Sequence, residues 1–244
     1  MISVCIATFN GSSYIERQLA SILDQIGPMD EIIICDDASE DETISLIESY
    51  KDNRISIHIN KVRLGHVNNF AKALSYATGD YIFLSDQDDI WLPGRVDKML
   101  LSLTSDVSVL LVASNFDLID EFDKHIGEFR KLKPENKSKL SRVLKIFLGK
   151  MPYYGCTFVF KKELLELCLP IPAKTESHDI WMALIANTFG VVNNLNIATL
   201  QHRIHQLNVT PRKRRSALVI VKSRIVLIKA YVARVFKLKF KKPL

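Results

Sequence analysis

Residues 81–91 read YIFLSDQDDIW, an apolar run with high β propensity that ends in three aspartates within four residues. Asp86, Asp88 and Asp89 place like charges side by side, which costs stability unless a cation shares them. At the end of a buried strand, such carboxylates suit a Mg²⁺ or Mn²⁺ ion that keeps open positions for phosphate oxygens. The competing interpretation is a solvated acidic turn, and we expect Asp89 to cap a helix that begins near Pro93.

The chain before this stretch alternates short apolar runs with amphipathic segments. Strands are predicted over 2–7, 31–35, 54–59 and 81–85, and helices follow the capping boxes Ser13/Glu16 and Ser39/Glu42 and cover 67–77. This alternation predicts an α/β fold, with a mostly parallel central sheet flanked by helices on both faces. Ligands bind such sheets at the carboxyl ends of the strands, where this chain places polar residues: Thr8, Asn10, Asp36, Asp37 and Asp86 to Asp89.

Further strands and helices are predicted downstream, with one interruption. We expect a helix after Pro93, a strand over 107–113, a mobile charged loop over 117–138, and then helix 140–148, strand 157–160, helix 162–168, helix 178–189 and strand 197–204. From Ser216 onward, apolar residues recur every three or four positions among lysines and arginines, which predicts a basic amphipathic helix. The chain is therefore divided into a domain over 1–211 and a basic C-terminal tail over 212–244.

Charge is distributed unevenly along the 244 residues. The net charge is +6, but residues 212–244 hold twelve lysines and arginines and no acidic residue, so residues 1–211 carry a net charge of −6. An acidic body does not fit a uniformly basic nucleic-acid binder, and no nucleic-acid partner is expected. The tail has three interpretations: an anionic membrane surface, another subunit or nucleic acid. The membrane is favoured, because each Lys or Arg near a negative bilayer gains about 1 kcal/mol.

Cysteine usage and the first residues indicate the compartment. The four cysteines, Cys5, Cys35, Cys156 and Cys168, have no CxxC spacing, so they are expected to be reduced core residues. The start MISVCIATFN lacks the basic region and long apolar run of a signal peptide. We expect a cytoplasmic protein that lies peripherally on the inner face of the cell membrane.

Three motifs together resemble a known family. The segments SVCIATFNGSSYIERQLASIL (3–23), CDDASEDET (35–43) and SDQDDIW (85–91) are similar to those of the family 2 glycosyltransferases of the GT-A fold, and the resemblance extends over about residues 1–210. The DQDD form resembles the rhamnosyltransferase-like members that build bacterial surface polysaccharides. The resemblance implies an inverting enzyme that uses a nucleoside diphosphate sugar.

The resemblance also implies roles for individual residues. Ala7, Thr8 and Phe9 would line the nucleotide pocket, Asp37 would read the pyrimidine edge, Asp86 would approach the ribose or the sugar, and Asp88 would hold the metal that bridges the diphosphate. In QHRIHQLN (201–208), Arg203 and His205 would contact the diphosphate. In SHDIW (177–181), Asp179 matches the catalytic base, although His178 stands where the family usually has an acid. The competing interpretation of Asp179 is a helix N-terminal charge.

Two loops have equally weighted interpretations. Gly155 and Cys156 in YYGCTFVF are either an acceptor-side loop, as the resemblance implies, or a turn and a buried thiol. Asn68 and Asn69 in GHVNNF either touch the donor or cap a helix.

These expectations combine into one function. The chain is predicted to be an inverting glycosyltransferase, dependent on Mn²⁺ or Mg²⁺, that moves a sugar, rhamnose from dTDP-rhamnose being the favoured donor, onto a lipid-linked or polysaccharide acceptor. Two alternatives are a nucleotidyltransferase that makes sugar nucleotides and a non-catalytic, membrane-associated nucleotide-sugar-binding protein. The first would need a glycine-rich, basic loop after the first strand, and ATFNGSSYIE has one glycine and no lysine.

Overall fold

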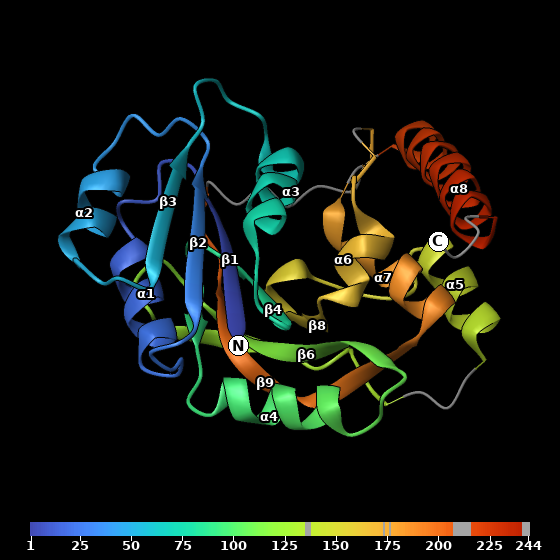
Figure 1. Ribbon diagram of the computed structural model, residues 1–244, viewed down its shortest axis with the longest axis horizontal. Helices are drawn as coiled ribbons and strands as arrows, with labels where there is room; N and C mark the ends of the chain where they lie inside the picture. The colour runs from blue at the N-terminus through green and yellow to red at the C-terminus, as the bar shows by residue number, and fades with distance from the viewer. Residues whose placement is uncertain (135–137, 173, 176, 207–215, 241–244) are drawn as a thin grey trace.

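The computed structural model describes residues 1–134, 138–172, 174–175, 177–206 and 216–240 (Figure 1). Within these residues the sheet has the order β3-β2-β1-β4-β8-β6-β9-β5, with β7 paired to β6. The strands are β1 (Ile2–Thr8), β2 (Glu31–Asp36), β3 (Ile55–Ile59), β4 (Tyr81–Asp86), β5 (Ile90–Trp91), β6 (Val109–Ile119), β7 (His125–Phe129), β8 (Phe158–Lys161) and β9 (Val191–Arg203). The helices are α1 (Ile15–Leu23), α2 (Thr43–Ser49), α3 (His66–Tyr76), α4 (Arg95–Thr104), α5 (Lys139–Phe147), the 3₁₀ turn η1 (Gly155–Thr157), α6 (Glu163–Cys168), α7 (His178–Phe189) and α8 (Ala217–Lys239).

The first half of the sheet is parallel, as the alternation of strands and helices predicted. β1 pairs in parallel with β2 and β4, and β2 pairs in parallel with β3. Thr8 lies opposite Asp36, and Ala7 lies opposite Asp86, so three strands end at one edge of the sheet. The predicted convergence of polar strand ends is therefore present.

The second half makes the sheet mixed, so the prediction of a mostly parallel sheet is wrong. β8 runs antiparallel to both β4 and β6. β5 is antiparallel to β9, and β7 is antiparallel to β6. β6 and β9 are parallel. The relative direction of two strands depends on pairing between distant segments, and the local hydrophobic period carries no information about it.

The segment predicted as a mobile loop, 117–138, contains β structure. β6 continues to Ile119, and β7 pairs with it so that Phe116 stacks on Phe129 with ring centroids 4.4 Å apart. Exposed charged residues interrupt the apolar alternation of this hairpin, so the strand pattern is weak in the sequence. Residues 135–137 of that prediction lie outside the described residues.

Helices cover both faces of the sheet and bury two apolar clusters. One cluster joins the sheet to α3, α5, α6 and α7, and the other joins the opposite face to α1, α2 and α4. Figure 1 shows α3, α6 and α7 above the sheet and α4 below it. Consecutive strand residues serve opposite clusters, because successive side chains of a strand point to opposite faces: Val4 packs on one side and Cys5 on the other.

The predicted helix caps differ from the observed ones. Tyr14 and Glu42 occupy the N-cap positions of α1 and α2 without a side-chain cap bond, so both capping boxes are wrong. Ser39 instead donates its hydroxyl to Asp36 at 2.5 Å. α4 begins at Arg95 after Gly94, whose φ is 73°, so the predicted cap by Asp89 is also wrong. Partners close in space bind the Ser39 hydroxyl and the Asp89 carboxylate, which are therefore not used at the helix ends.

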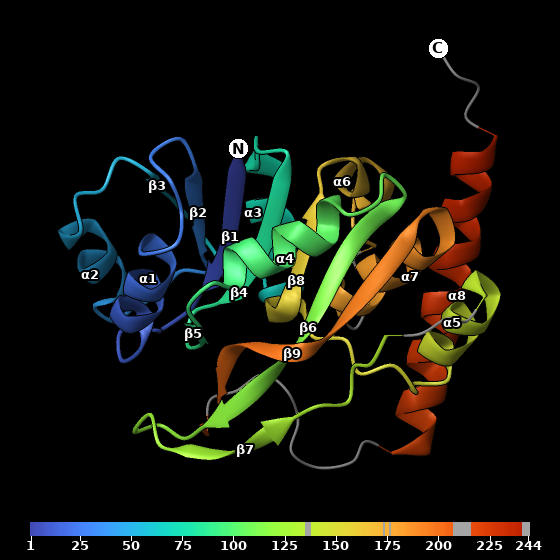
Figure 2. The same ribbon diagram turned by 90° about the horizontal axis from the view of Figure 1, so that it is seen from below.

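α8 lies beside α5 and α7 (Figure 2). Leu227 is buried in the interface, the Tyr231 hydroxyl is 2.9 Å from the Thr188 hydroxyl, and Arg234 donates to the carbonyl oxygens of Leu169 and Pro170. The apolar stripe of the predicted amphipathic helix is not covered by the rest of the described chain: Leu218, Val221, Ile225, Ile228 and Val232 are 43–75% exposed. Its predicted contact with a membrane or another subunit stays a prediction. Among the described residues, no helix combines the length and apolar character that crossing a bilayer requires.

Candidate active site

The carboxyl ends of β1, β2 and β4 border a cavity of about 1540 Å³. Every residue predicted at these strand ends for the donor or the metal lines it: Ala7, Thr8, Phe9, Asp37, Asp86 and Asp88. The opposite walls come from α5, the segment before β8, the start of α7 and α8. The fold thus gathers the strand-end motifs and the helical half around one opening.

The turn after β1 is held by Gln87, a residue for which the sequence predicted no role. The backbone amide of Phe9 donates to Gln87 Oε1 at 2.8 Å, and Gln87 Nε2 donates to the Phe9 carbonyl at 3.0 Å. The Thr8 hydroxyl donates to Asp36 at 2.8 Å. Side chains therefore link the end of β1 both to the residue that follows β4 and to the end of β2. The only signal for Gln87 is its place between two acids of the DQDD motif.

Asp37 orders the segment that precedes α3. Its carboxylate accepts hydrogen bonds from the amides of Leu64 at 2.6 Å and Gly65 at 2.8 Å, and from Asn60 Nδ2 at 3.0 Å. Arg63 lies with its guanidinium carbon 3.7 Å from the centroid of the Phe9 ring, a cation–π contact beside Asp37. The predicted reading of a pyrimidine by Asp37 stays a prediction.

Asn68 and Asn69 do not cap α3, whose N-cap is Gly65. Asn69 lines the cavity and donates through Nδ2 to the Cys35 carbonyl at 2.7 Å, whereas Asn68 is exposed. The capping interpretation is therefore wrong for both.

Asp88 forms a pair with His205 at the cavity wall. Oδ2 of Asp88 is 2.6 Å from Nε2 of His205, and both side chains line the cavity. The backbone carbonyl of Asp88 accepts a hydrogen bond from Arg203 Nε at 2.9 Å. Arg203 itself is fully buried, does not line the cavity, and forms an ion pair with Asp123 at 2.6 Å. Arg203 therefore holds the backbone of Asp88 from the side away from the cavity. The predicted contact of Arg203 with a phosphate stays a prediction.

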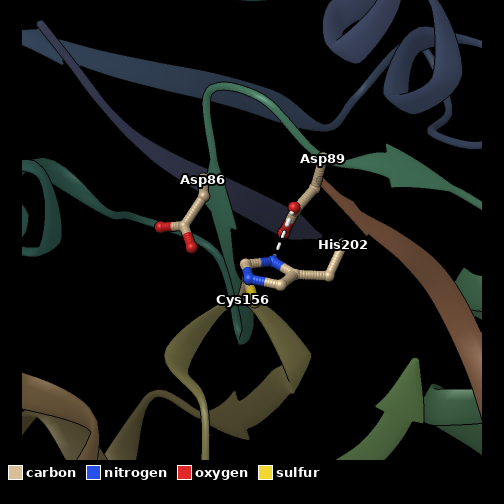
Figure 3. A group of neighbouring side chains, drawn as sticks. All are labelled: Asp86, Asp89, Cys156 and His202. Atoms are coloured by element: carbon tan, nitrogen blue, oxygen red, sulfur yellow. Dashed lines mark hydrogen bonds and ion pairs between the residues drawn. The ribbon is translucent and has the colours of Figure 1, made fainter. Parts of the chain in front are cut away.

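A second acidic group lies next to this pair (Figure 3). Oδ1 of Asp89 is 2.8 Å from His202 Nδ1 and accepts from the Arg203 amide at 3.2 Å. Burial disfavours charge on His202, but Asp89 and then Asp86 outweigh this and raise the pKa of His202 to about 9. Burial, reinforced by Asp89 and Asp88, raises the pKa of Asp86 to about 8. The crowded carboxylates therefore favour a proton on Asp86 and a positive charge on His202 near neutral pH, and a bound cation would take over the role of that proton.

The donor atoms present fit a divalent metal ion. Ligand atoms of Asp86, Asp89, Cys156 and His202 lie within 4.8 Å of one another, and Oδ2 of Asp89 is buried without a hydrogen-bond partner among the described residues. Burial raises the pKa of the Cys156 thiol, so this sulfur stays protonated. Carboxylate oxygens suit Mn²⁺ or Mg²⁺. Next to the DQDD motif, the cavity is lined by Asp86, Asp88, His202 and His205.

Asp179 lies at the N-terminus of α7, on the wall opposite the strand ends. Its Oδ1 accepts from the Ile180 amide at 2.6 Å and its Oδ2 from the Gly155 amide at 3.2 Å. Burial outweighs these hydrogen bonds and raises the pKa of Asp179 to about 6. A carboxylate with this pKa is ionised at neutral pH and still basic enough to accept a proton.

Gly155 and Cys156 serve different neighbours. A Cβ at Gly155 would lie 2.7 Å from Nε2 of His178, so the absent side chain makes room for that ring. Cys156 is buried and does not line the cavity, and its carbonyl accepts a hydrogen bond from the buried Arg95 at 2.7 Å. Gly155 lines the cavity, which leaves its predicted acceptor-side position open to test.

Sequence comparison identifies the family. The sequence profile described as Glycosyl transferase family 2 matches residues 3–168. The chain belongs to glycosyltransferase family 2. This membership confirms the predicted family, and it argues against the nucleotidyltransferase alternative. The rhamnosyltransferase-like subgroup stays a prediction.

Two curated relatives extend the comparison of this family 2 glycosyltransferase. It is 24% identical over 215 residues to the UDP-Glc:alpha-D-GlcNAc-diphosphoundecaprenol beta-1,3-glucosyltransferase WfgD of Escherichia coli, over 87% of the chain and 81% of WfgD. It is 30% identical over 196 residues to the uncharacterized glycosyltransferase MJ1057 of Methanocaldococcus jannaschii, over 78% of the chain and 66% of that relative.

The fold of this family 2 glycosyltransferase also occurs in a solved structure. The crystal structure of S. aureus TarS 1–349 in complex with UDP-GlcNAc matches with a TM-score of 0.74 at 15% identity, over 96% of this chain and 66% of that one. The likeness supports the GT-A-like α/β architecture. The chain spans about two thirds of that TarS segment.

Proposed function

We propose that the protein transfers a sugar from a nucleoside diphosphate donor to an acceptor hydroxyl with inversion, and that Asp179 is the general base. The observation that carries this proposal is that Asp179 lines the same cavity as Asp86 and Asp88, with both carboxylate oxygens oriented by backbone amides. Inversion requires a base on the face of the sugar opposite the leaving group. Asp179 comes from the helical wall, whereas the acids that suit the leaving diphosphate come from β4.

We assign the metal-holding role to Asp88 and His205, with Asp86 beside them. A divalent ion bound there would supply Lewis-acid stabilisation of the charge that the leaving diphosphate gains. Asp88 lines the cavity, and Arg203 donates a hydrogen bond to its backbone carbonyl. Thr8, Phe9 and Asp37 would bind and orient the nucleoside.

The donor is proposed to be a pyrimidine nucleoside diphosphate hexose. The DQDD motif favours dTDP-rhamnose, whereas WfgD is named for UDP-Glc and the TarS crystal contained UDP-GlcNAc. These three donors therefore define the first experiment. The acceptor is proposed to be a lipid-linked or polysaccharide intermediate in bacterial surface polysaccharide synthesis, a proposal that the diphosphoundecaprenol acceptor in the name of WfgD supports.

We also propose that α8 lies on the anionic inner surface of the cell membrane. Its outer face exposes Ile225, Ile228 and Val232 next to Lys222 and Lys229, and its sequence has no acidic residue. Apolar burial in the interface and attraction of the lysines to anionic lipid would act together.

The test of the reaction is donor turnover by the full chain. Purified protein is incubated with Mn²⁺ and, separately, with UDP-glucose, UDP-GlcNAc and dTDP-rhamnose, and release of the nucleoside diphosphate is measured. We expect one donor to be turned over, and EDTA to stop the release. A folded protein that binds none of the three donors and releases no nucleotide with any of them would refute the proposal.

A further inference from the structure

The cavity is larger than a single donor requires. Small-molecule sites are typically about 300–1,000 Å³, and this cavity measures about 1540 Å³. The acidic side chains among its described lining residues are Asp37, Asp86, Asp88 and Asp179. The remaining space is bordered by α5, by the segment that follows it and by α8, none of which the proposed donor site uses. Part of the cavity is therefore available to a second substrate.

The walls of this remaining space are apolar. Phe147, Met151, Ile180 of α7 and Ile220 of α8 all line the cavity. Phe147 and Met151 also pack at the edge of one core cluster. Ile180 follows Asp179 directly in the chain, so the apolar space begins next to the proposed base. Ile220 is 44% exposed, and the exposed apolar residues further along α8, Ile225, Ile228 and Val232, do not line the cavity. An extended apolar group can therefore run from the base toward the surface of α8.

A cation is built into the same wall. Arg224 of α8 lines both the main cavity and a smaller pocket between α7 and α8. Gly149 has a φ of 66°, and a Cβ there would lie 3.1 Å from Nη2 of Arg224, so the glycine allows the guanidinium a close approach to the backbone. A guanidinium with planar donors matches the oxygens of a phosphate group.

We infer that Phe147, Met151, Ile180, Ile220 and Arg224 form an acceptor subsite, here called the α5–α8 subsite, for a lipid-linked phosphate or diphosphate. The apolar residues contact the first part of the lipid chain, and Arg224 contacts the phosphate. The attached sugar then extends toward Asp179. This inference rests on the proposed glycosyl transfer, because the acceptor hydroxyl has to reach the base. A water-soluble sugar would leave the apolar walls without a partner.

Direct binding of a simple lipid diphosphate tests the subsite. Farnesyl diphosphate is titrated into the full chain in the presence of EDTA, so that the metal site does not contribute, and binding is followed by calorimetry. Farnesol and inorganic diphosphate are the two partial probes. We expect farnesyl diphosphate to bind more tightly than either, because only it uses both the apolar walls and Arg224.

Substitutions assign the binding to the subsite. Arg224→Ala should weaken farnesyl diphosphate about tenfold, as expected for loss of a hydrogen-bonded charge contact, and Arg224→Lys should recover part of the loss. Met151→Asp should weaken both farnesyl diphosphate and farnesol. The matched control is Lys98→Ala, because Lys98 is an exposed cation on α4 that does not line the cavity. Thermal unfolding of each variant checks the fold.

The outcomes separate this inference from the proposed function. Equal binding of farnesyl diphosphate to wild type and Arg224→Ala, or loss of binding in Asp88→Ala instead, would overturn the subsite. Nucleotide binding with Mn²⁺ is measured on the same samples and should be unchanged in Arg224→Ala. If lipid diphosphate binds as expected while no nucleotide binds, the proposed transfer fails and the lipid-phosphate site stands.

Discussion

The backbone amide of Gly155 donates a hydrogen bond to Oδ2 of Asp179 across 3.2 Å. The other oxygen, Oδ1, accepts from the Ile180 amide at 2.6 Å. The turn before β8 and the first turn of α7 therefore hold one carboxylate from two sides. A base fixed in this way loses little orientational freedom when an acceptor hydroxyl arrives.

Replacing Asp179 by asparagine tests the base directly. Asn keeps the shape and the acceptor oxygen of the side chain but cannot take a proton, so transfer should fall by about 10²–10⁴-fold. The rate of nucleoside diphosphate release in the presence of acceptor measures this loss. Donor affinity, measured by thermal shift with Mn²⁺, should stay at the wild-type value. Transfer within a few-fold of wild type would remove Asp179 from the mechanism.

The pH dependence should follow the same carboxylate. Asp179 has a pKa raised from 3.8 to about 6 by burial, so kcat/KM should rise with pH through about 6 as the base ionises. Folding stability should change in the opposite sense. Between the unfolded-state pKa of 3.8 and the folded-state pKa of about 6, Asp179 binds more protons in the folded state than in the unfolded state. The contribution of Asp179 to folding stability therefore falls as pH rises. In urea unfolding, Asp179→Asn should therefore gain stability relative to wild type from pH 4 to pH 7, and a constant difference would contradict the raised pKa.

Metal binding should depend on Asp88 and His205 together. Asp88→Ala and His205→Ala should each weaken Mn²⁺ binding in the presence of nucleoside diphosphate by roughly 10–100-fold. Losses of this size follow even from mutating residues that only hydrogen-bond to a metal ligand. Calorimetry on the ternary mixture measures the effect. Asp97→Asn is the control, because Asp97 is an exposed acid on α4 outside the cavity. Full Mn²⁺ affinity in both site variants would show that the ion is held elsewhere.

Gly155→Ala should disturb the base through His178. The added Cβ would lie 2.7 Å from Nε2 of His178, and overpacking of this kind costs about 1–3 kcal/mol. We expect lower stability in urea and slower transfer, because the Gly155 amide no longer meets Asp179 in the same position. Adding His178→Ala removes the colliding ring and should restore most of the stability. A double variant as unstable as Gly155→Ala alone would rule out this contact as the cause.

Membrane association should depend on the outer face of α8. The protein should sediment with vesicles that contain anionic phosphatidylglycerol and less with neutral vesicles, and the attraction should weaken as salt increases. Ile228→Asp should reduce sedimentation, because it adds charge to the exposed apolar stripe. Leu101→Asp is the matched control, since Leu101 is 75% exposed on α4. Equal losses in both variants would indicate a non-specific effect.

Local pattern accounts for the parts of the site that lie on strand ends. Asp37, Asp86 and Asp88 follow apolar runs, and parallel strands bring such ends to one edge, so their shared cavity could be predicted. His205 and Asp179 were found only through resemblance to the family. The contact of Asp88 with His205, 117 positions apart in the chain, has no local signal, and neither does the cross-link of Phe9 by Gln87.

The amino-acid sequence by itself determined the α/β class, the parallel first half of the sheet and the acidic strand ends, because hydrophobic period and chain reversal are local properties. Only the tertiary structure decided that β8 joins β4 and β6 in antiparallel fashion, that Asp89 binds His202 rather than a helix end, and that α8 packs through Leu227 while its apolar stripe faces outward. Each of these depends on which distant segments meet. That choice is made by the packing of the whole chain.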